Sequence, residues 1–155
     1  RRDLGANVPR KLLIGILAAV VLFLVFYLGN IFIRFLFERA GEGIQNVYSF
    51  RQDAHPLRIG LLMLLIIGPG EELFWRGYLQ RKLGDRYGKW TGFVVATLLY
   101  TAVHIATGNM VLVLAAMVCG IFWGWLYLRY RSMLINVVSH TVWDIGVFLL
   151  LPFSY

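Results

Sequence analysis

Six ionisable residues lie inside long apolar stretches of this sequence, where an unpaired charge is costly. They are Glu71, Glu72, Arg76, His104, His140 and Asp144. A charged side chain at the centre of a bilayer costs roughly 3 kcal/mol or more unless it is paired or hydrated. Carboxylates and imidazoles that are kept in the membrane despite this free-energy cost indicate acid–base or metal-assisted chemistry. All six residues are therefore candidate catalytic residues.

The two adjacent glutamates have different prospects. Glu72 and Arg76 are i, i+4 neighbours on one helix face and can neutralise each other. Glu71 points about 100° away and has no such partner. We therefore expect Glu71 to act as a general base or metal ligand. The alternative is that both glutamates are structural and only interact with Arg76 and with the helix N-terminus that follows the Gly-Pro-Gly stretch.

The histidines lie on two polar stripes. Tyr100 and His104 share one helix face, and Asn136, His140 and Asp144 recur every four residues on another. Asp144 can accept a proton from the imidazole one turn earlier and fix its tautomer. Together with Glu71, these histidines supply a base or metal ligand, a second ligand, and a donor for developing negative charge. That set is what water activation needs.

The apolar runs that position these residues predict an all-α, polytopic transmembrane bundle of about five spans. The first lies between Lys11 and Arg34, long enough to cross a core of roughly 30 Å. Residues 59–80 form a second, with a kink expected at residues 68–70. Residues 90–128 carry no charged side chain and suit two spans joined at 107–109, and residues 132–153 make a fifth. Residues 38–56 read as a polar loop.

Composition supports the membrane assignment and excludes other classes. Of 155 residues, 59% are apolar or aromatic and 15% are charged, with a mean hydropathy of +0.70, which excludes a soluble or disordered chain. Cys119 is the single cysteine, so the chain has no internal disulfide and no cysteine-based zinc site. The net charge of +7 comes from Lys and Arg at the ends of apolar runs. That placement favours lipid headgroups over nucleic acid as the partner.

Charge placement also predicts a topology. Ten Lys and Arg residues fall on the side of the N-terminus and of residues 81–89, against four on the other side, which favours a cytoplasmic N-terminus and a C-terminus on the far side. Counted from the basic side, Glu71, His104 and His140 lie roughly 15, 21 and 12 Å deep. We expect them to surround one water-filled cavity that opens toward Arg81–Lys89.

Several other intramembrane chemistries lack their motifs here. The chain has no His-Glu-x-x-His helix, no serine in a Gly-x-Ser setting, no second intramembrane aspartate and no phosphate loop. A transporter with a proton relay would be expected to show inverted repeats, and the sequence shows none.

Three short motifs resemble those of one protein family. Residues 71–76 match Glu-Glu-x-x-x-Arg; residues 100–104 match aromatic-x-x-x-His, with Tyr where Phe is usual; and residues 140–144 match His-x-x-x-Asn/Asp. The sequence thus resembles the CPBP family, which comprises type II CAAX prenyl endopeptidases and bacteriocin-processing or immunity (Abi) proteins. The resemblance implies a protease core at residues 57–153, preceded at 1–56 by a transmembrane helix and the polar loop.

The resemblance implies an intramembrane endopeptidase acting on membrane-associated proteins or peptides, in a bacterial or archaeal cytoplasmic membrane. It implies that Glu71 and His104 activate water, and that His140 and Asp144 stabilise an oxyanion or bind metal. If zinc is used, Glu71, His104 and His140 are its expected ligands. Prenyl endopeptidases commonly have Asn in place of Asp144, so the aspartate favours a bacterial-type member in which it orients His140. The alternative is a catalytically silent subunit or immunity protein that binds a partner in a larger assembly.

Overall fold

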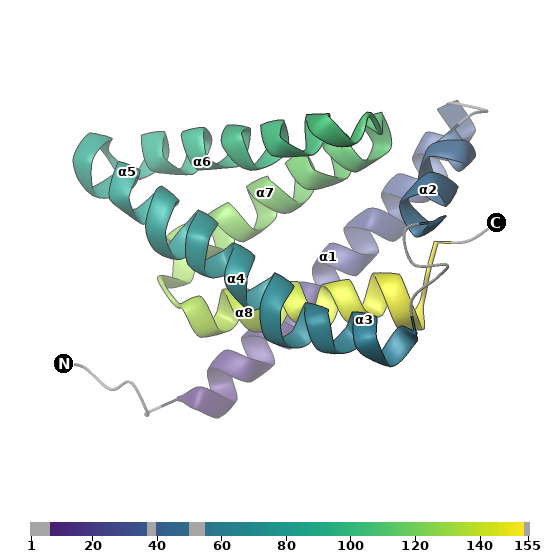
Figure 1. Ribbon diagram of the computed structural model, residues 1–155. Coiled ribbons are helices and arrows are strands. Elements are labelled where there is room, and N and C mark those ends of the chain that lie inside the picture. Colours follow the sequence, from purple (N-terminus) through teal and green to yellow (C-terminus); the bar gives the residue numbers. More distant parts are fainter. Residues whose placement is uncertain (1–6, 37–39, 50–54, 154–155) are drawn as a thin grey trace.

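The computed structural model describes residues 7–36, 40–49 and 55–153, and every element within them is helical (Figure 1). Four helical segments are long and apolar enough to cross a membrane: Val8–Ile33, Lys89–Thr107, Met110–Tyr130 and Met133–Leu150. The prediction of a polytopic helical bundle is therefore confirmed. The elements are α1 (Val8–Leu36), α2 (Ala40–Ser49), α3 (Pro56–Leu62), α4 (Gly68–Glu72), α5 (Arg81–Tyr87), α6 (Lys89–Val103), α7 (Met110–Tyr130) and α8 (Met133–Ile145).

The second expected span differs from the prediction. Residues 56–87 form one uninterrupted helical run, in which α3, α4 and α5 are joined by π-helical turns at Met63–Ile67 and Leu73–Gln80. This run is not among the four spanning candidates of the described chain, because its charged residues interrupt the apolar stretch. The expected kink takes the form of a π turn that precedes Gly68, whose N–H bonds to the carbonyl of Met63. Figure 1 shows the run changing direction between α3 and α5.

The prediction of a polar loop over 38–56 was wrong for the part that the structure describes. Residues 40–49 form α2, and residue 56 already begins α3; residues 37–39 and 50–54 lie outside the described part. The helix forms because Ile44 is buried while Asn109, at the start of α7, donates from Nδ2 to the carbonyl of Gly43 over 2.8 Å. An amphipathic helix stabilised by tertiary contacts is not detected by counting polar residues.

The expected turn between the third and fourth spans is confirmed. Helix α6 ends in a 3₁₀ turn, His104–Thr107, and Gly108 then takes a left-handed conformation with φ of +66°. Asn109 caps α7 by accepting hydrogen bonds at Oδ1 from the N–H groups of Val111 and Leu112. This turn reverses the chain, so that α7 packs back along α6 (Figure 1).

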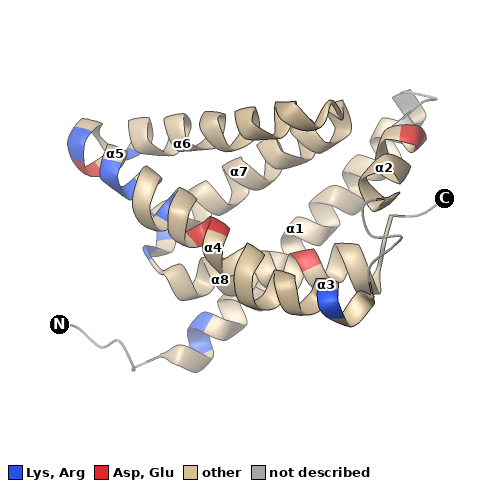
Figure 2. Cartoon of the chain, viewed as in Figure 1, with Lys and Arg blue, Asp and Glu red and all other residues tan. Residues whose placement is uncertain are grey.

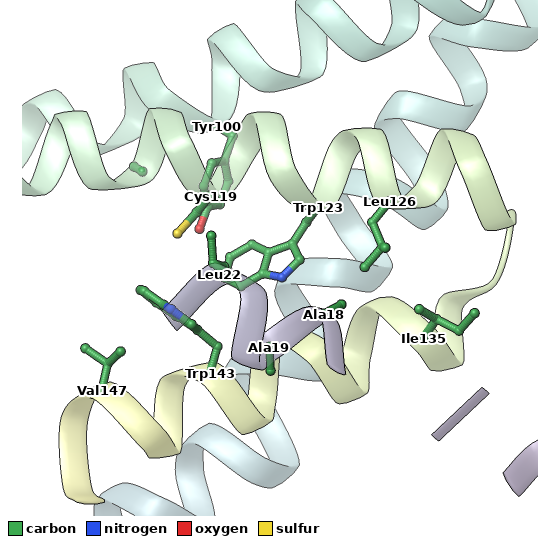
Figure 3. Close-up of a cluster of buried hydrophobic side chains, with 11 residues drawn as sticks. Ala18, Ala19, Leu22, Tyr100, Cys119, Trp123, Leu126, Ile135, Trp143 and Val147 are labelled. Atoms are coloured by element: carbon green, nitrogen blue, oxygen red, sulfur yellow. The ribbon is translucent and has the colours of Figure 1, made fainter. Parts of the chain in front are cut away.

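The buried core lies where α1, α7 and α8 meet. Figure 3 shows the indole of Trp123 on α7 near the middle of this cluster, next to Leu22 of α1, and its ring also contacts that of Trp143 on α8. Helix α1 packs tightly against α8 at Gly15, where an added Cβ would lie 2.7 Å from Cγ1 of Val138. The glycine permits this contact, because any side chain there would push the two helices apart.

Basic residues gather at one end of the bundle. Figure 2 shows Lys and Arg on α5, at the start of α1 and where α7 gives way to α8, with a further basic position on α3; it also shows acidic positions on α4, where Glu72 is buried. This arrangement agrees with the sequence-based assignment of basic segments to one membrane side.

Candidate active site

Glu72 is the centre of a buried polar cluster. Its side chain is fully buried and accepts three hydrogen bonds. Arg76 donates from Nη1 to Oε1 over 2.9 Å, His140 from Nδ1 to Oε1 over 2.8 Å, and Asn136 from Nδ2 to Oε2 over 2.9 Å. The predicted Glu72–Arg76 pair is therefore confirmed. The same carboxylate also ties α4 to α8.

The tautomer of His140 is set by Glu72, and not by Asp144 as predicted. A carboxylate paired with Arg76 only accepts hydrogen bonds, so Nδ1 of His140 must carry a proton. Nε2 then faces Oδ2 of Asp144 across 3.5 Å, which is within ion-pair distance but too long for a good hydrogen bond. The prediction failed because one helical turn leaves Asp144 slightly too far, whereas the packing of α4 against α8 brings Glu72 closer.

Aromatic rings enclose this cluster. The imidazole of His140 stacks on the indole of Trp123, with ring centroids 3.7 Å apart and planes 15° apart. The guanidinium of Arg76 lies 4.8 Å from the ring centroid of Tyr100 and 5.7 Å from that of Trp123. Cation–π contacts and the Glu72 ion pair together offset the cost of burying Arg76.

Glu71 differs from its neighbour in having a free carboxylate oxygen. Its Oε2 is buried and has no hydrogen-bond partner among the described residues. A buried polar atom without a partner normally costs free energy, and its presence in a native structure indicates a role such as catalysis. The prediction that Glu71 is the unpaired carboxylate is confirmed by this geometry.

One ring nitrogen of His104 has no hydrogen-bond partner among the described residues. Its Nδ1 lies 2.8 Å from the carbonyl oxygen of Tyr100, one turn earlier. Since a carbonyl can only accept, Nδ1 is the donor and the neutral ring has its lone pair at Nε2. The side chain is half-buried at the first residue of the 3₁₀ turn. His104 is therefore arranged as an acceptor for a water proton.

One cavity of about 460 Å³ brings the predicted residues together. Its lining includes four of them, on α4, the 3₁₀ turn and α8: Glu71, His104, His140 and Asp144. Glu72 and Arg76 do not line it and lie behind it in the buried cluster. The expectation that Glu71, His104 and His140 surround one cavity is therefore confirmed.

The predicted direction and character of the cavity were wrong. Its remaining walls are mostly apolar and come mainly from α1, α2, α7 and the residues that follow α8. The cavity therefore extends toward α2, and none of residues 81–89 lines it. Toward the basic end, Gln80 donates to the carbonyl of Gly124 over 2.9 Å and Arg76 to that of Gly120 over 3.4 Å, which ties this helical run to α7. Charge counting identifies membrane sides, but side-chain packing decides which end is filled.

The residues do not form the expected zinc site. Within the described part of the chain, no group of three His, Cys, Asp or Glu side chains is arranged to hold a metal ion. Nδ1 of His140 donates to Glu72, and its Nε2 faces Oδ2 of Asp144 across 3.5 Å. No step of the reaction below is therefore assigned to a metal.

Sequence reasoning missed two contributors to the site. Trp123 supplies the surface on which His140 stacks, and its carbonyl accepts from Asn136 over 2.8 Å. Ser139 accepts from Nε1 of Trp123 over 3.2 Å and so orients the indole. Asn136 was visible on the His140 stripe, but nothing in the sequence indicated a partner for it. Trp123 carried no signal, since an aromatic residue in an apolar span is ordinary.

The fold and the buried cluster around Glu72 and His140 define a helical integral membrane protein with a glutamate–histidine site. The chain belongs to the family described as type II CAAX prenyl endopeptidase Rce1-like, whose model matches residues 53–146. All six candidate residues lie in this range. No curated protein sequence matches the chain. No solved structure matches it either. Membership in this family makes the chain a CAAX-type intramembrane protease in general terms, with a peptide or protein in the membrane as its substrate.

Proposed function

We propose that the chain hydrolyses peptide bonds of membrane-embedded substrates with a water molecule activated by Glu71 and His104. The observation that carries the proposal is the buried Oε2 of Glu71, which has no hydrogen-bond partner among the described residues, on a residue that lines the same cavity as His104, His140 and Asp144. A general base must be within reach of the water that it deprotonates, and a cavity shared by these groups provides that reach.

The first step forms the bond between water and the substrate carbonyl. Nε2 of His104 accepts one proton of the water in a hydrogen bond and positions it, because Nδ1 is committed to Tyr100. Glu71 takes the other proton as the water oxygen attacks the carbonyl carbon. The tetrahedral intermediate then carries the negative charge on the former carbonyl oxygen. When the C–N bond breaks, Glu71 returns its proton to the leaving amine.

His140 and Asp144 stabilise the oxyanion by sharing one proton. Nδ1 of His140 donates to Glu72, so a second proton, carried by Nε2 or by Oδ2 across their 3.5 Å separation, is needed to prevent repulsion of a lone pair by a carboxylate. That proton is available for a hydrogen bond to the oxyanion. Preorganised donors of this kind contribute on the order of 10² to 10³ in rate. Glu72, Arg76 and Asn136 are positioning residues, since they hold the imidazole and do not line the cavity.

The apolar walls favour a substrate whose cleaved segment is itself apolar or lipid-modified. Among the lining residues from α1 and α2, the polar side chains are Asn30 and Tyr48, and none is charged. A water-soluble, charged peptide would lose its hydration there without gaining partners. The substrate class is therefore a membrane-associated peptide, consistent with the family to which the chain belongs.

The deciding experiment measures cleavage of a quenched fluorescent peptide carrying an S-alkylated cysteine, by purified protein in detergent or lipid vesicles. Glu71→Gln should lower kcat by about 10²- to 10⁴-fold, which is the loss expected for a general base. Asp85→Asn removes an exposed carboxylate on α5 and serves as the matched control, with activity unchanged. Full activity of Glu71→Gln would refute the assignment. A parent protein that binds such peptides but never cleaves them would instead indicate a silent binding subunit.

Metal analysis of the same preparations tests the metal-free form of the mechanism. We expect substoichiometric zinc in the parent and in Glu71→Gln, and cleavage that survives a chelator. Stoichiometric zinc that disappears in Glu71→Gln would replace this mechanism with one in which zinc activates the water.

A further inference from the structure

Helix α1 diverges from α8 along its length. At Gly15 an added Cβ would lie 2.7 Å from Val138, whereas at Gly29 an added Cβ would have nothing within 4 Å. The two glycines are about 21 Å apart along the helix. Between the two glycines, Ala19, Leu22 and Phe26 recur at helical spacing on one face of α1. Gly29 lies on this same face, which packs against α8 nearer the N-terminus of α1.

The divergence opens the space that the cavity occupies. Gly29 lines the cavity together with Phe26 and Ile33 of α1, while Glu71 and His104 line it on the side of the reacting groups. An apolar compartment and the catalytic residues are thus parts of one cavity of about 460 Å³. Glycine disfavours helix, and so its presence within a spanning helix calls for a reason other than helix formation.

Helices α1 and α2 lie outside the residues that match the family model, which begins at residue 53. The chemistry of the site therefore comes from the matched core, and much of the apolar wall comes from this chain's own N-terminal helices. In this division, the matched core cleaves the bond and the N-terminal helices select the substrate.

We propose that the Gly29 face of α1 forms a subsite for a bulky apolar group of the substrate, and that the missing side chain at residue 29 sets its size limit. The proposal rests on the proteolytic function proposed above. The group is an apolar chain, which the substrate can carry either as a lipid attached to cysteine or as consecutive large side chains. Burial of the apolar group against α1 provides affinity for the substrate, and the width of the cavity at Gly29 selects among apolar groups of different size.

The test is a size series at residue 29 with a control on the outer face of the same helix. Gly29→Ala, Gly29→Leu and Gly29→Phe progressively fill the compartment. Leu28→Phe adds bulk one residue away, where the side chain is 64% exposed and does not line the cavity. Because an added Cβ at residue 29 meets nothing within 4 Å and glycine disfavours helix, no variant of the series should unfold at a lower temperature than the parent.

The probes are peptides of one sequence with S-methyl, S-geranyl or S-farnesyl cysteine, and a fourth with unmodified residues and a run of Leu. Gly29→Phe should raise KM for the long-chain peptides by about tenfold, in the range by which pockets discriminate apolar groups. KM for the S-methyl peptide and kcat for all peptides should stay unchanged, as should every parameter of Leu28→Phe. The long-chain probe whose KM responds identifies the source of the apolar group.

Equilibrium binding of the same peptides to Glu71→Gln and to Glu71→Gln/Gly29→Phe separates this proposal from the catalytic one. Weaker binding of long-chain peptides to the double variant supports the subsite even if Glu71 proves not to be the base. Equal binding of all peptides to both proteins, or equal effects of Gly29→Phe and Leu28→Phe, would overturn the subsite whatever the outcome for catalysis.

Discussion

The imidazole of His140 on α8 donates from Nδ1 to Oε1 of Glu72 on α4 over 2.8 Å, inside a fully buried cluster. This bond connects two motifs separated by 68 residues and fixes which nitrogen of His140 is directed toward Asp144. The two adjacent glutamates therefore have different roles: Glu72 holds the buried cluster together, while Glu71 lines the cavity and has one buried oxygen without a partner among the described residues.

The two glutamates should respond differently to the same substitution. Glu72→Gln leaves Arg76 buried without its ion partner and weakens the bond to His140, which should lower the free energy of unfolding by about 3–5 kcal/mol. Glu71→Gln removes no ion pair of the described chain and should unfold near the parent temperature. Thermal unfolding in one detergent compares the two, and equal stability of both variants would contradict the division of roles.

Asp144→Asn tests the shared proton at His140. An amide cannot share that proton as a carboxyl group can, so we expect kcat to fall by about 10²- to 10³-fold, the range measured for oxyanion donors. In the parent, activity should decline at alkaline pH as the His140–Asp144 pair loses its proton, and Asp144→Asn should shift or remove that decline. Rate measurements across pH on both proteins provide the readout. An Asp144→Asn protein as active as the parent at every pH would show that the carboxylate is dispensable.

Asn109 joins the start of α7 to α2, and two substitutions separate its functions. Asn109→Ala loses both the helix cap and the bond to the Gly43 carbonyl, which should cost about 1–2 kcal/mol of stability. Asn109→Asp keeps an oxygen to cap α7 but cannot donate to Gly43. Limited proteolysis near residues 40–49 should therefore increase in both variants, while thermal unfolding should drop mainly in Asn109→Ala. Unchanged proteolysis of α2 in Asn109→Asp would show that this bond does not hold the helix.

Much of the candidate site was readable from residue types and spacing. The i, i+4 relation predicted the Glu72–Arg76 pair, and the 100° offset between neighbours predicted that Glu71 would lack such a partner. Depth along the apolar runs placed Glu71, His104 and His140 in one layer, and they do line one cavity. Local helical geometry suffices for these relations because each depends only on positions within a turn or on distance from a span end.

The sequence by itself determined the membrane class, the helical spans and the three polar motifs, since hydropathy and helical periodicity are properties of the chain alone. The tertiary structure decided that Glu72 and not Asp144 sets the tautomer of His140, that Trp123 stacks on that ring, and that α2 is a helix. It also decided that the cavity extends along α1 toward α2. These features depend on contacts between residues far apart in sequence, and on glycines that let helices approach at one end and diverge at the other. No local pattern encodes which side chain of a distant helix will fill a given space.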